Sequence, residues 1–180
     1  VRGVELDAEQ ARSWMGRSLV DVFGNTSEGV ALQQAYQTFN RAHLEELQTD
    51  VVGIRELLGE LSQAGVKVGV ATSKNRHAAQ RSVTAARLDD LVELTTTLDE
   101  TPVHKPQPDP LVHARRKMDS DVETCVYVGD AVWDIRAAKA AAMDQVAVTW
   151  GAGERTMLEA EEPNAGVVET VHELRNLLLG

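Results

Sequence analysis

Three short segments carry residue types that could bind and transfer a phosphoryl group. Thr72-Ser73-Lys74-Asn75 follows an apolar run, Lys105 lies in a proline-rich run, and Asp130 and Asp134 follow a second apolar run. Hydroxyls at a helix N-terminus bind anions, a lysine neutralises them, and paired carboxylates suit a hard cation such as Mg²⁺. These residue types therefore predict a site for phosphate and metal.

Thr72 and Ser73 are candidate phosphate-binding residues because a predicted helix begins directly after them, at about Arg76. The N-terminus of a helix attracts negative charge, and its first amides are free to donate hydrogen bonds. An ordinary structural explanation is also available, because Ser and Thr are favoured N-cap residues. The tetrapeptide alone does not decide between a phosphate site and a helix cap.

Lys105 begins the run Lys-Pro-Gln-Pro-Asp-Pro. Proline restricts its own backbone and that of the preceding residue, so this loop would hold the ammonium group at a defined point. The alternative is a solvated loop lysine, with Pro108 and Pro110 marking the start of a helix. The density of prolines around one lysine favours the first explanation.

Asp130 lies at the tip of a predicted strand, and Asp134 lies four residues later, one turn into a predicted helix. Both side chains can face one cleft at this spacing. Magnesium prefers oxygen ligands and keeps several waters, so we expect one carboxylate to bind it directly and the other through water. Acidic residues are also common in a first helical turn, where they complement the helix dipole.

The elements that must position these residues are of two kinds. Residues 7–48 show helical spacing throughout, whereas helices and short apolar strands alternate after residue 50. The predicted helices cover residues 54 to about 65, 76–86, 109–118, 131–142 and 171–179, with a short one near Met157. The predicted strands cover residues 66–71, 91–95, 124–128, 145–149 and 167–168. This alternation predicts an α/β fold with a doubly wound parallel sheet. We expect residues 1–50 to form a helical cap segment and residues 51–180 the α/β core.

Composition narrows the range of partners. The chain has 28 acidic and 18 basic residues and a net charge of −10, so nucleic acid would be repelled. No apolar run reaches the roughly 18 to 20 residues that span a bilayer, so we expect no membrane insertion. Cys125 is the single cysteine, and no basic segment followed by an apolar one opens the sequence. These features predict a reducing cytoplasm.

The three segments resemble motifs of a known superfamily when taken in order. Ala71-Thr72-Ser73-Lys74, His104-Lys105-Pro106-x-Pro108-Asp109-Pro110 and Gly129-Asp130-x-x-x-Asp134-Ile135 resemble motifs two, three and four of the haloacid dehalogenase (HAD) superfamily. The helical segment before residue 50 looks like the small cap of phosphoglycolate-phosphatase-like members. The resemblance implies a Rossmann-like core and magnesium-assisted phosphoryl transfer from a small phosphorylated metabolite, by a monomer or homodimer.

The resemblance also implies individual roles. Thr72 would bind the transferring phosphoryl group with help from Ser73, Lys105 would neutralise it, and Asp130 would hold magnesium with support from Asp134. One residue departs from the superfamily pattern without affecting the chemistry: Ala142 lies at a predicted helix end where glycine is expected.

One element of the superfamily pattern is absent from this sequence. Members carry the nucleophile in an amino-terminal strand that reads Asp-x-Asp-Gly-Thr, and the segment Glu5-Leu6-Asp7 lacks both the apolar strand and the Gly-Thr. We hypothesise that about 20 to 30 residues, the usual length of a strand and its loop, precede Val1 in the active protein. The chain as given should then be weakly active and poorly soluble, because neighbouring strands lose a partner.

Other functions remain open at this stage. A non-catalytic module could keep affinity for phosphate and magnesium without turnover. A phosphomutase or a dehalogenase would share the scaffold, although dehalogenation needs no magnesium and therefore no Asp130/Asp134 pair. The acidic pair favours phosphoryl chemistry.

Overall fold

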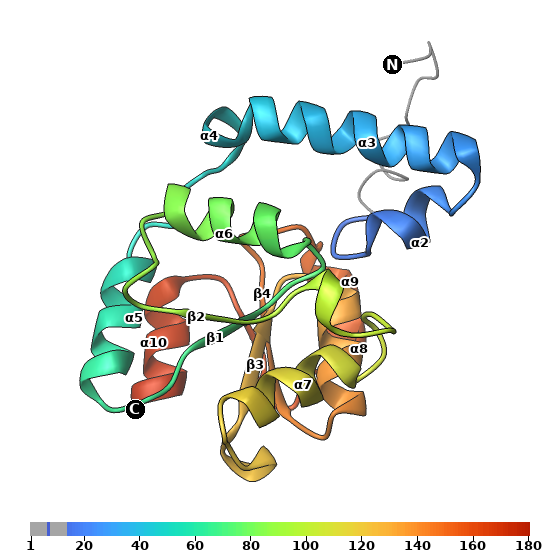
Figure 1. Ribbon diagram of the computed structural model, residues 1–180. Helices are drawn as coiled ribbons and strands as arrows, with labels where there is room; N and C mark the ends of the chain where they lie inside the picture. Colours follow the sequence, from blue (N-terminus) through green and yellow to red (C-terminus); the bar gives the residue numbers. More distant parts are fainter. Residues whose placement is uncertain (1–6, 8–13) are drawn as a thin grey trace.

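The computed structural model describes residue 7 and residues 14–180, and the predicted helical stretch over residues 8–13 lies outside them. Helices α2 (Leu19–Phe23), α3 (Ser27–Ala42) and α4 (Leu44–Leu47) come first. In Figure 1, α3 and α4 lie above the remaining elements, and α2 lies below the right-hand end of α3. The Ser18 and Thr26 side chains accept hydrogen bonds from first-turn amides and so define where α2 and α3 begin. The division into a cap and a core at residue 50 stays a prediction.

After residue 50, helices and strands alternate as the sequence predicts. The elements are α5 (Ile54–Gln63), β1 (Gly69–Ala71), α6 (Arg76–Ala85), β2 (Glu93–Thr96), α7 (Asp109–Lys117), β3 (Val126–Gly129), α8 (Val132–Ala140), β4 (Asp144–Val148), α9 (Arg155–Ala160), β5 (Val167–Val168) and α10 (Val171–Leu179). Two 3₁₀ turns, Leu98–Glu100 and Val122–Thr124, lie in the connections. Every described strand pair is parallel, which confirms the α/β fold class.

Helices cover both faces of the strands, as the side chains of β4 show. Val146 and Val148 pack with α5 and α10, whereas Ala147, between them in sequence, packs with Ile135 of α8 and with α9. Because successive strand residues point to opposite faces, these contacts place helices on both sides of β4. Helix α7 packs on α8 through Leu111, so it belongs to the second side.

The strands are hydrogen-bonded in two groups, β1 with β2 and β3 with β4 and β5. Thr72 N–H donates to Thr96 O, and Asp144 N–H donates to Cys125 O. Because backbone groups alternate along a parallel strand, Gly69 and Ala71 must then direct theirs away from β2, and Val126 away from β4. Strands β1 and β3 therefore each have an edge without a backbone ladder in the described part of the chain.

The exposure of the strands agrees with this division. All residues of β4 after Asp144 are buried, whereas Val126 at the start of β3 is 39% exposed. The first strand is also shorter than predicted: it begins at Gly69, because Val66 and Lys67 lead into it along an exposed surface. None of the described helices is long and apolar enough to cross a membrane.

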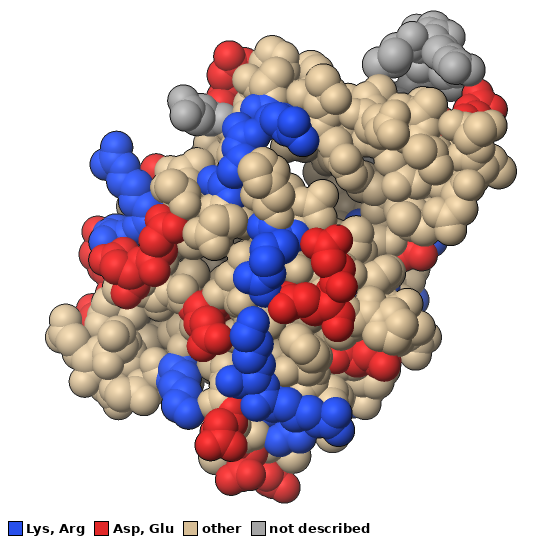
Figure 2. Space-filling view, viewed as in Figure 1, with Lys and Arg blue, Asp and Glu red and all other residues tan. Residues whose placement is uncertain are grey.

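The charged side chains are interspersed on the face shown in Figure 2. Lys and Arg side chains form a line down the middle of the molecule, with Asp and Glu on both sides of it. Several are paired, and Arg76 Nη2 lies 2.7 Å from Glu100 Oε1. The net negative charge is thus locally compensated on this face.

Candidate functional site

The predicted site residues come from three loops that meet at the carboxyl ends of β1 and β3. Ala71 ends β1 and leads to Thr72, Lys105 comes from the proline-rich loop before α7, and Asp134 lies in the first turn of α8. Ligands bind at this edge of open α/β sheets because the connecting loops converge there. The structure brings the Lys105 ammonium next to both of the other segments.

The Lys105 ammonium group is buried and has three hydrogen-bond acceptors. Nζ donates to Asp134 Oδ1 at 2.8 Å, to Tyr127 Oη at 2.6 Å and to the carbonyl oxygen of Ala71 at 3.0 Å. Lys105 is 7% exposed and Asp134 5%. A buried charge is tolerated when it is paired and fully hydrogen-bonded, and three acceptors match the three protons of an ammonium.

These contacts determine the charge state of the cluster. Burial alone would lower the pKa of Lys105, but Tyr127 and Asp134 beside it outweigh burial and raise it above its usual value. Burial also raises the pKa of Tyr127 to about 12, with the Asp134 charge acting in the same direction. At neutral pH Lys105 is therefore a charged ammonium and Tyr127 a neutral phenol.

Asp134 also fixes the start of α8. Its Oδ2 accepts hydrogen bonds from the amides of Asp130 and Ala131, at 3.2 and 3.1 Å. Both oxygens of Asp134 thus have protein donors, and Gly129 packs so closely that an added Cβ would lie 2.3 Å from Asp134 Cβ. Asp134 orients Lys105 and the loop that carries Asp130.

Asp130 points toward the loop that follows β4. Its Oδ2 accepts a hydrogen bond from Ala152 N–H at 2.8 Å, and its carbonyl oxygen accepts one from Gly153 N–H at 2.7 Å. A Cβ at Gly151 would lie 2.0 Å from Asp130 Oδ2, so only glycine fits beside this carboxylate. Burial raises the pKa of Asp130, the Ala152 amide opposes this, and the neighbouring Asp134 charge adds to the rise.

Thr72 and Ser73 do not cap the next helix. Asn75 is the N-cap of α6, because its side chain accepts a hydrogen bond from Ala78 N–H. The Thr72 hydroxyl instead accepts from Lys74 N–H at 3.2 Å, and the Ser73 hydroxyl donates to Gly16 O at 3.0 Å. Thr72 follows Ala71, whose carbonyl oxygen accepts a hydrogen bond from Lys105, while Ser73 connects the loop to the residues before α2.

The segment before α2 rests on the loops of the site. Gly16 has φ +82°, and a Cβ there would lie 2.8 Å from Ala131 Cβ, so the backbones approach closely. The Arg17 guanidinium lies 5.3 Å from the ring centre of Trp133, and that of Arg136 lies 5.5 Å from it. Trp133 therefore joins the amino-terminal segment to α8 through cation–π contacts.

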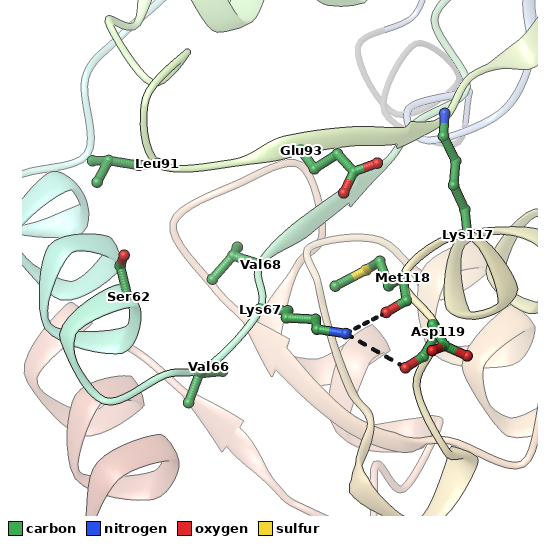
Figure 3. Close-up of a pocket in the computed structure, with 9 residues that line it drawn as sticks. All are labelled: Ser62, Val66, Lys67, Val68, Leu91, Glu93, Lys117, Met118 and Asp119. Atoms are coloured by element: carbon green, nitrogen blue, oxygen red, sulfur yellow. Dashed lines mark hydrogen bonds between the residues drawn. The ribbon is translucent and has the colours of Figure 1, made fainter.

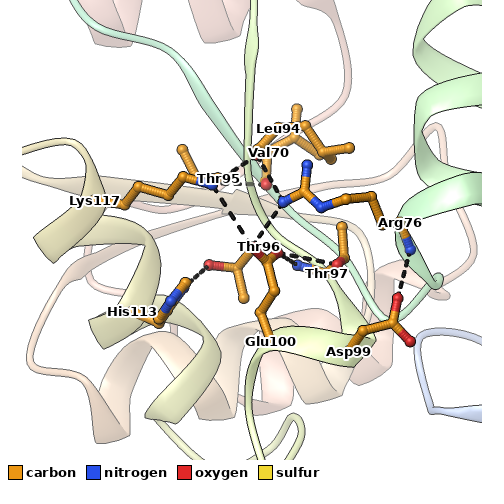
Figure 4. Close-up of polar contacts among 10 residues, drawn as sticks. All are labelled: Val70, Arg76, Leu94, Thr95, Thr96, Thr97, Asp99, Glu100, His113 and Lys117. Carbon is orange, nitrogen blue, oxygen red and sulfur yellow. Dashed lines mark hydrogen bonds and ion pairs between the residues drawn. The ribbon is translucent and has the colours of Figure 1, made fainter.

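A polar network fixes the start of the loop that carries Lys105 (Figure 4). Glu100 Oε2 accepts from the amide of Thr97 at 2.8 Å and from its hydroxyl at 3.0 Å, while Arg76 pairs with the other oxygen. Burial would raise the pKa of Glu100, but the hydrogen bonds from Arg76 and Thr97 prevail and lower it to about 2. The hydroxyl of the buried Thr96 lies 2.9 Å from His113 Nδ1, which belongs to α7, and this hydrogen bond connects β2 to that helix.

An open hollow of about 500 Å³ lies at the opposite ends of β1 and β2 (Figure 3). Its walls include Glu93, Lys117 and Lys67, whose Nζ donates to the carbonyl oxygen of Met118 at 2.8 Å. No predicted site residue lines it. The candidate site therefore rests on the strand ends, not on this hollow.

Comparison with known proteins identifies the family. A model of haloacid dehalogenase-like hydrolases matches residues 2–148. This chain belongs to that family. The pyrophosphatase PpaX of Bacillus thuringiensis (strain Al Hakam) is 32% identical over 158 residues, which are 87% of this chain and 73% of that protein. The family membership agrees with the resemblance seen in the three motif segments.

Solved structures show the same fold. A hydrolase from Pseudomonas syringae superposes with a TM-score of 0.84 at 23% identity, over 96% of this chain and 83% of that one. The β-phosphoglucomutase of Clostridium difficile gives a TM-score of 0.81 at 17% identity, over 98% and 83%. The haloacid dehalogenase-like fold is thus shared with proteins of little sequence similarity.

Two features of the site were missed by sequence reasoning. Tyr127 lies within an apolar strand, where a buried hydroxyl needs a partner, and this rule could have singled it out. The amide of Ala152 lies far from Asp130 in sequence, and no spacing rule connects the two. The glycines at 151 and 153 were the available signal, since close backbone approach favours glycine.

Proposed function

We propose that the protein is a phosphatase that hydrolyses a small phosphorylated metabolite with the help of Mg²⁺. The observation that carries the proposal is the buried Lys105 ammonium, held at the end of β1 next to Thr72 and in contact with Asp134. A fixed positive charge in a site of low dielectric stabilises a transferring phosphoryl group far more than it would in water. The relative that is 32% identical to this chain, PpaX, is a pyrophosphatase and supports this class of reaction.

In the proposed reaction, Thr72 and Lys105 bind the phosphoryl oxygens. The Thr72 hydroxyl accepts from Lys74 N–H and so keeps its own proton free to donate to a phosphoryl oxygen. Ser73 can join them only by releasing the Gly16 carbonyl, which makes its role dependent on the position of the amino-terminal segment. These assignments stay predictions.

The residues present fit Mg²⁺ with Asp130 as the direct ligand. Asp130 Oδ2 accepts from Ala152 N–H, and Oδ1 has no hydrogen-bond donor among the other described residues, whereas both oxygens of Asp134 accept hydrogen bonds. The described residues contain no group of three or more acidic, His or Cys side chains that could hold a metal, so oxygen atoms from outside them, including those of water and substrate, would complete the coordination. When bound, the ion would neutralise negative charge on the phosphoryl group.

The attacking carboxylate has to come from outside residues 14–180. Phosphoryl transfer in this proposal needs an aspartate in line with the phosphorus, and Asp134 is already held by Lys105 and two amides. The open edges of β1 and β3 lie on either side of Lys105 and would accept one extended segment. The proposal therefore includes an Asp-x-Asp-Gly-Thr segment encoded upstream of Val1.

The test is phosphate release from inorganic pyrophosphate, chosen because a relative is a pyrophosphatase, and from a panel of small phosphomonoesters. We expect slow release by the 180-residue chain, and release faster by orders of magnitude when the upstream segment is present. Lys105→Met and removal of Mg²⁺ should each abolish it. Activity that survives Lys105→Met, or an upstream reading frame without the motif, would contradict the proposal.

The second candidate is a non-catalytic module that binds phosphate and magnesium. The observation in its favour is that the polar groups of Lys105 and Asp134 already have hydrogen-bond partners within the described residues: each other, Tyr127, Ala71 and the amides of Asp130 and Ala131. Inorganic phosphate binding without turnover, in the presence of the upstream segment, would favour this function over a phosphatase.

A further inference from the structure

The Lys105 cluster contains a hydroxyl to which the proposed reaction assigns no role. Tyr127 Oη accepts a hydrogen bond from Lys105 Nζ at 2.6 Å and lies 3.2 Å from Ala71 O and 3.4 Å from Asp134 Oδ1. The shorter of the last two distances is to the carbonyl, so the Tyr127 hydroxyl donates its hydrogen bond to Ala71 O. The three ammonium protons then go to Tyr127, Ala71 and Asp134, and no buried side-chain N or O of the described residues lacks a partner.

Tyr127 also joins two parts of the structure that have no common backbone ladder. Its own strand, β3, pairs with β4, whereas Ala71 ends β1, which pairs with β2. The Tyr127–Ala71 and Lys105–Ala71 hydrogen bonds connect the two groups of strands at the edge where the site lies. The tyrosine is therefore placed to set the distance between the Thr72 loop and the Lys105 ammonium.

From this geometry we infer that Tyr127 is a positioning residue for Lys105, an inference that rests on the proposed binding of a phosphoryl group at that ammonium. Its hydroxyl oxygen holds Nζ at the end of β1, and its proton keeps the Ala71 carbonyl hydrogen-bonded.

The arrangement allows the Lys105 ammonium to redirect one N–H hydrogen bond to a ligand while keeping its proton. All three Nζ protons are in use, so a phosphoryl oxygen can bind Nζ only by replacing one acceptor. Ala71 O is the acceptor that can be released, because Tyr127 still donates to it and the carbonyl is not left unpaired. A buried carbonyl without a donor would otherwise oppose the exchange.

The test replaces the hydroxyl alone. Tyr127→Phe removes one oxygen from the cluster, and Tyr36→Phe, on the exposed surface of α3, is the matched control because these are the two tyrosines of the chain. The first readout is the exchange with water of the Lys105 ammonium protons, followed in ¹H–¹⁵N spectra and assigned by Lys105→Met. We expect exchange about tenfold faster in Tyr127→Phe, as for loss of one hydrogen bond to a charged group, and no change in Tyr36→Phe. Unchanged exchange in Tyr127→Phe would overturn the inference.

The second readout is the affinity for inorganic phosphate, measured by calorimetry on the same three proteins. We expect an affinity at least fivefold lower in Tyr127→Phe than in the unmodified chain, with Tyr36→Phe unaffected. Faster ammonium exchange together with an unmodified chain that does not bind phosphate would contradict the proposed function while leaving the positioning of Lys105 by Tyr127 standing. Equal phosphate affinity in a chain that does bind phosphate would overturn the role of Tyr127 in binding.

A measurement on the unmodified chain covers the case in which Tyr127→Phe fails to fold. The Tyr127 hydroxyl proton should exchange slowly enough to be observed and should show nuclear Overhauser contacts to the Lys105 side chain, since the two polar atoms are 2.6 Å apart. Absence of these contacts in the folded chain would overturn the inference without any variant.

Discussion

Lys105 shows how a protein of net charge −10 keeps one cation out of water at the place where an anion is expected. The charge is balanced by Asp134 and by two neutral acceptors, so removal of the lysine would leave a carboxylate buried without its counter-charge. Truncating one partner of a buried pair is costly for this reason, whereas an exposed pair contributes little.

Lys105→Met is therefore expected to lower the free energy of unfolding by about 3 kcal/mol or more. The matched control is Lys67→Met, because Lys67 also donates to carbonyl oxygens but is exposed, and we expect a loss of under about 1 kcal/mol there. Urea unfolding of both variants measures the difference. Equal losses would show that the Lys105 cluster is not buried in solution.

Glu100 gives a prediction on acid stability. Its pKa is lowered in the folded chain to about 2 from a usual value of 4.5, so the folded state binds the proton less readily than the unfolded state. The stabilisation is complete above about pH 5 and is lost as the pH falls through 4.5 toward 2. We expect the stability difference between the unmodified chain and Glu100→Gln to shrink over this range. A difference that is constant with pH would contradict the assigned hydrogen bonds.

Ala142 occupies a backbone conformation that disfavours it. It follows α8 with φ +56°, in the left-handed region, and its amide donates to Lys139 O. Sequence reasoning predicted glycine at this helix end, and the observed conformation gives the physical reason. We expect Ala142→Gly to raise the free energy of unfolding by about 0.5 to 1 kcal/mol, measured by urea unfolding. Ala140→Gly, inside α8, should have the opposite sign.

At the scale of the elements, the alternation of helices and strands was predictable from periodicity alone, and the parallel pairing confirms the predicted fold class. The bounds of the strands were less predictable. The strand predicted over residues 124–128 begins two residues later in the structure, at Val126, because Val122–Thr124 forms a 3₁₀ turn instead. An apolar run indicates burial, but only the partner strand determines where the ladder starts.

The contacts between the loops were the part that sequence could not provide. Spacing placed Lys105 and Asp134 at strand ends, but the hydrogen bond between them depends on how far each loop extends from the sheet. The same holds for Asp130 and the Ala152 amide, which depend on the position of β4 beside β3. Long-range geometry of this kind follows from packing, not from local pattern.

The open edges of β1 and β3 make a prediction about hydrogen exchange. The amides of Gly69 and Val126 point away from the partner strands, whereas Thr72 N–H is bonded to Thr96 O. We expect the first two amides to exchange with water much faster than that of Thr72, because exchange is slow only where a hydrogen bond must open. Amide exchange followed by NMR measures this. Equal protection would mean that another segment pairs with these edges.

At the scale of the whole molecule, the same edges favour association. The edges of β1 and β3 that have no backbone ladder in the described part of the chain, with Val126 partly exposed, can pair with another chain, although the net charge of −10 opposes close approach. We expect the 180-residue chain to associate increasingly as salt screens this repulsion, measured by light scattering between low and high ionic strength. A monomer with a sharp, cooperative melt at high salt would contradict the predicted poor solubility.

Trp133 lies near the guanidinium groups of both Arg17 and Arg136 and so connects the segment before α2 to α8. The indole is therefore in contact with one residue of the segment before α2 and with one residue of its own helix. If the segment before α2 moves away from α8, the Arg17 guanidinium leaves the ring while that of Arg136 stays. The fluorescence of Trp133 therefore reports on the position of this segment, and it can be measured alone after Trp14 and Trp150 are replaced with Phe. We expect the emission to change when the segment moves away, and Arg17→Gln should produce the same change without any ligand.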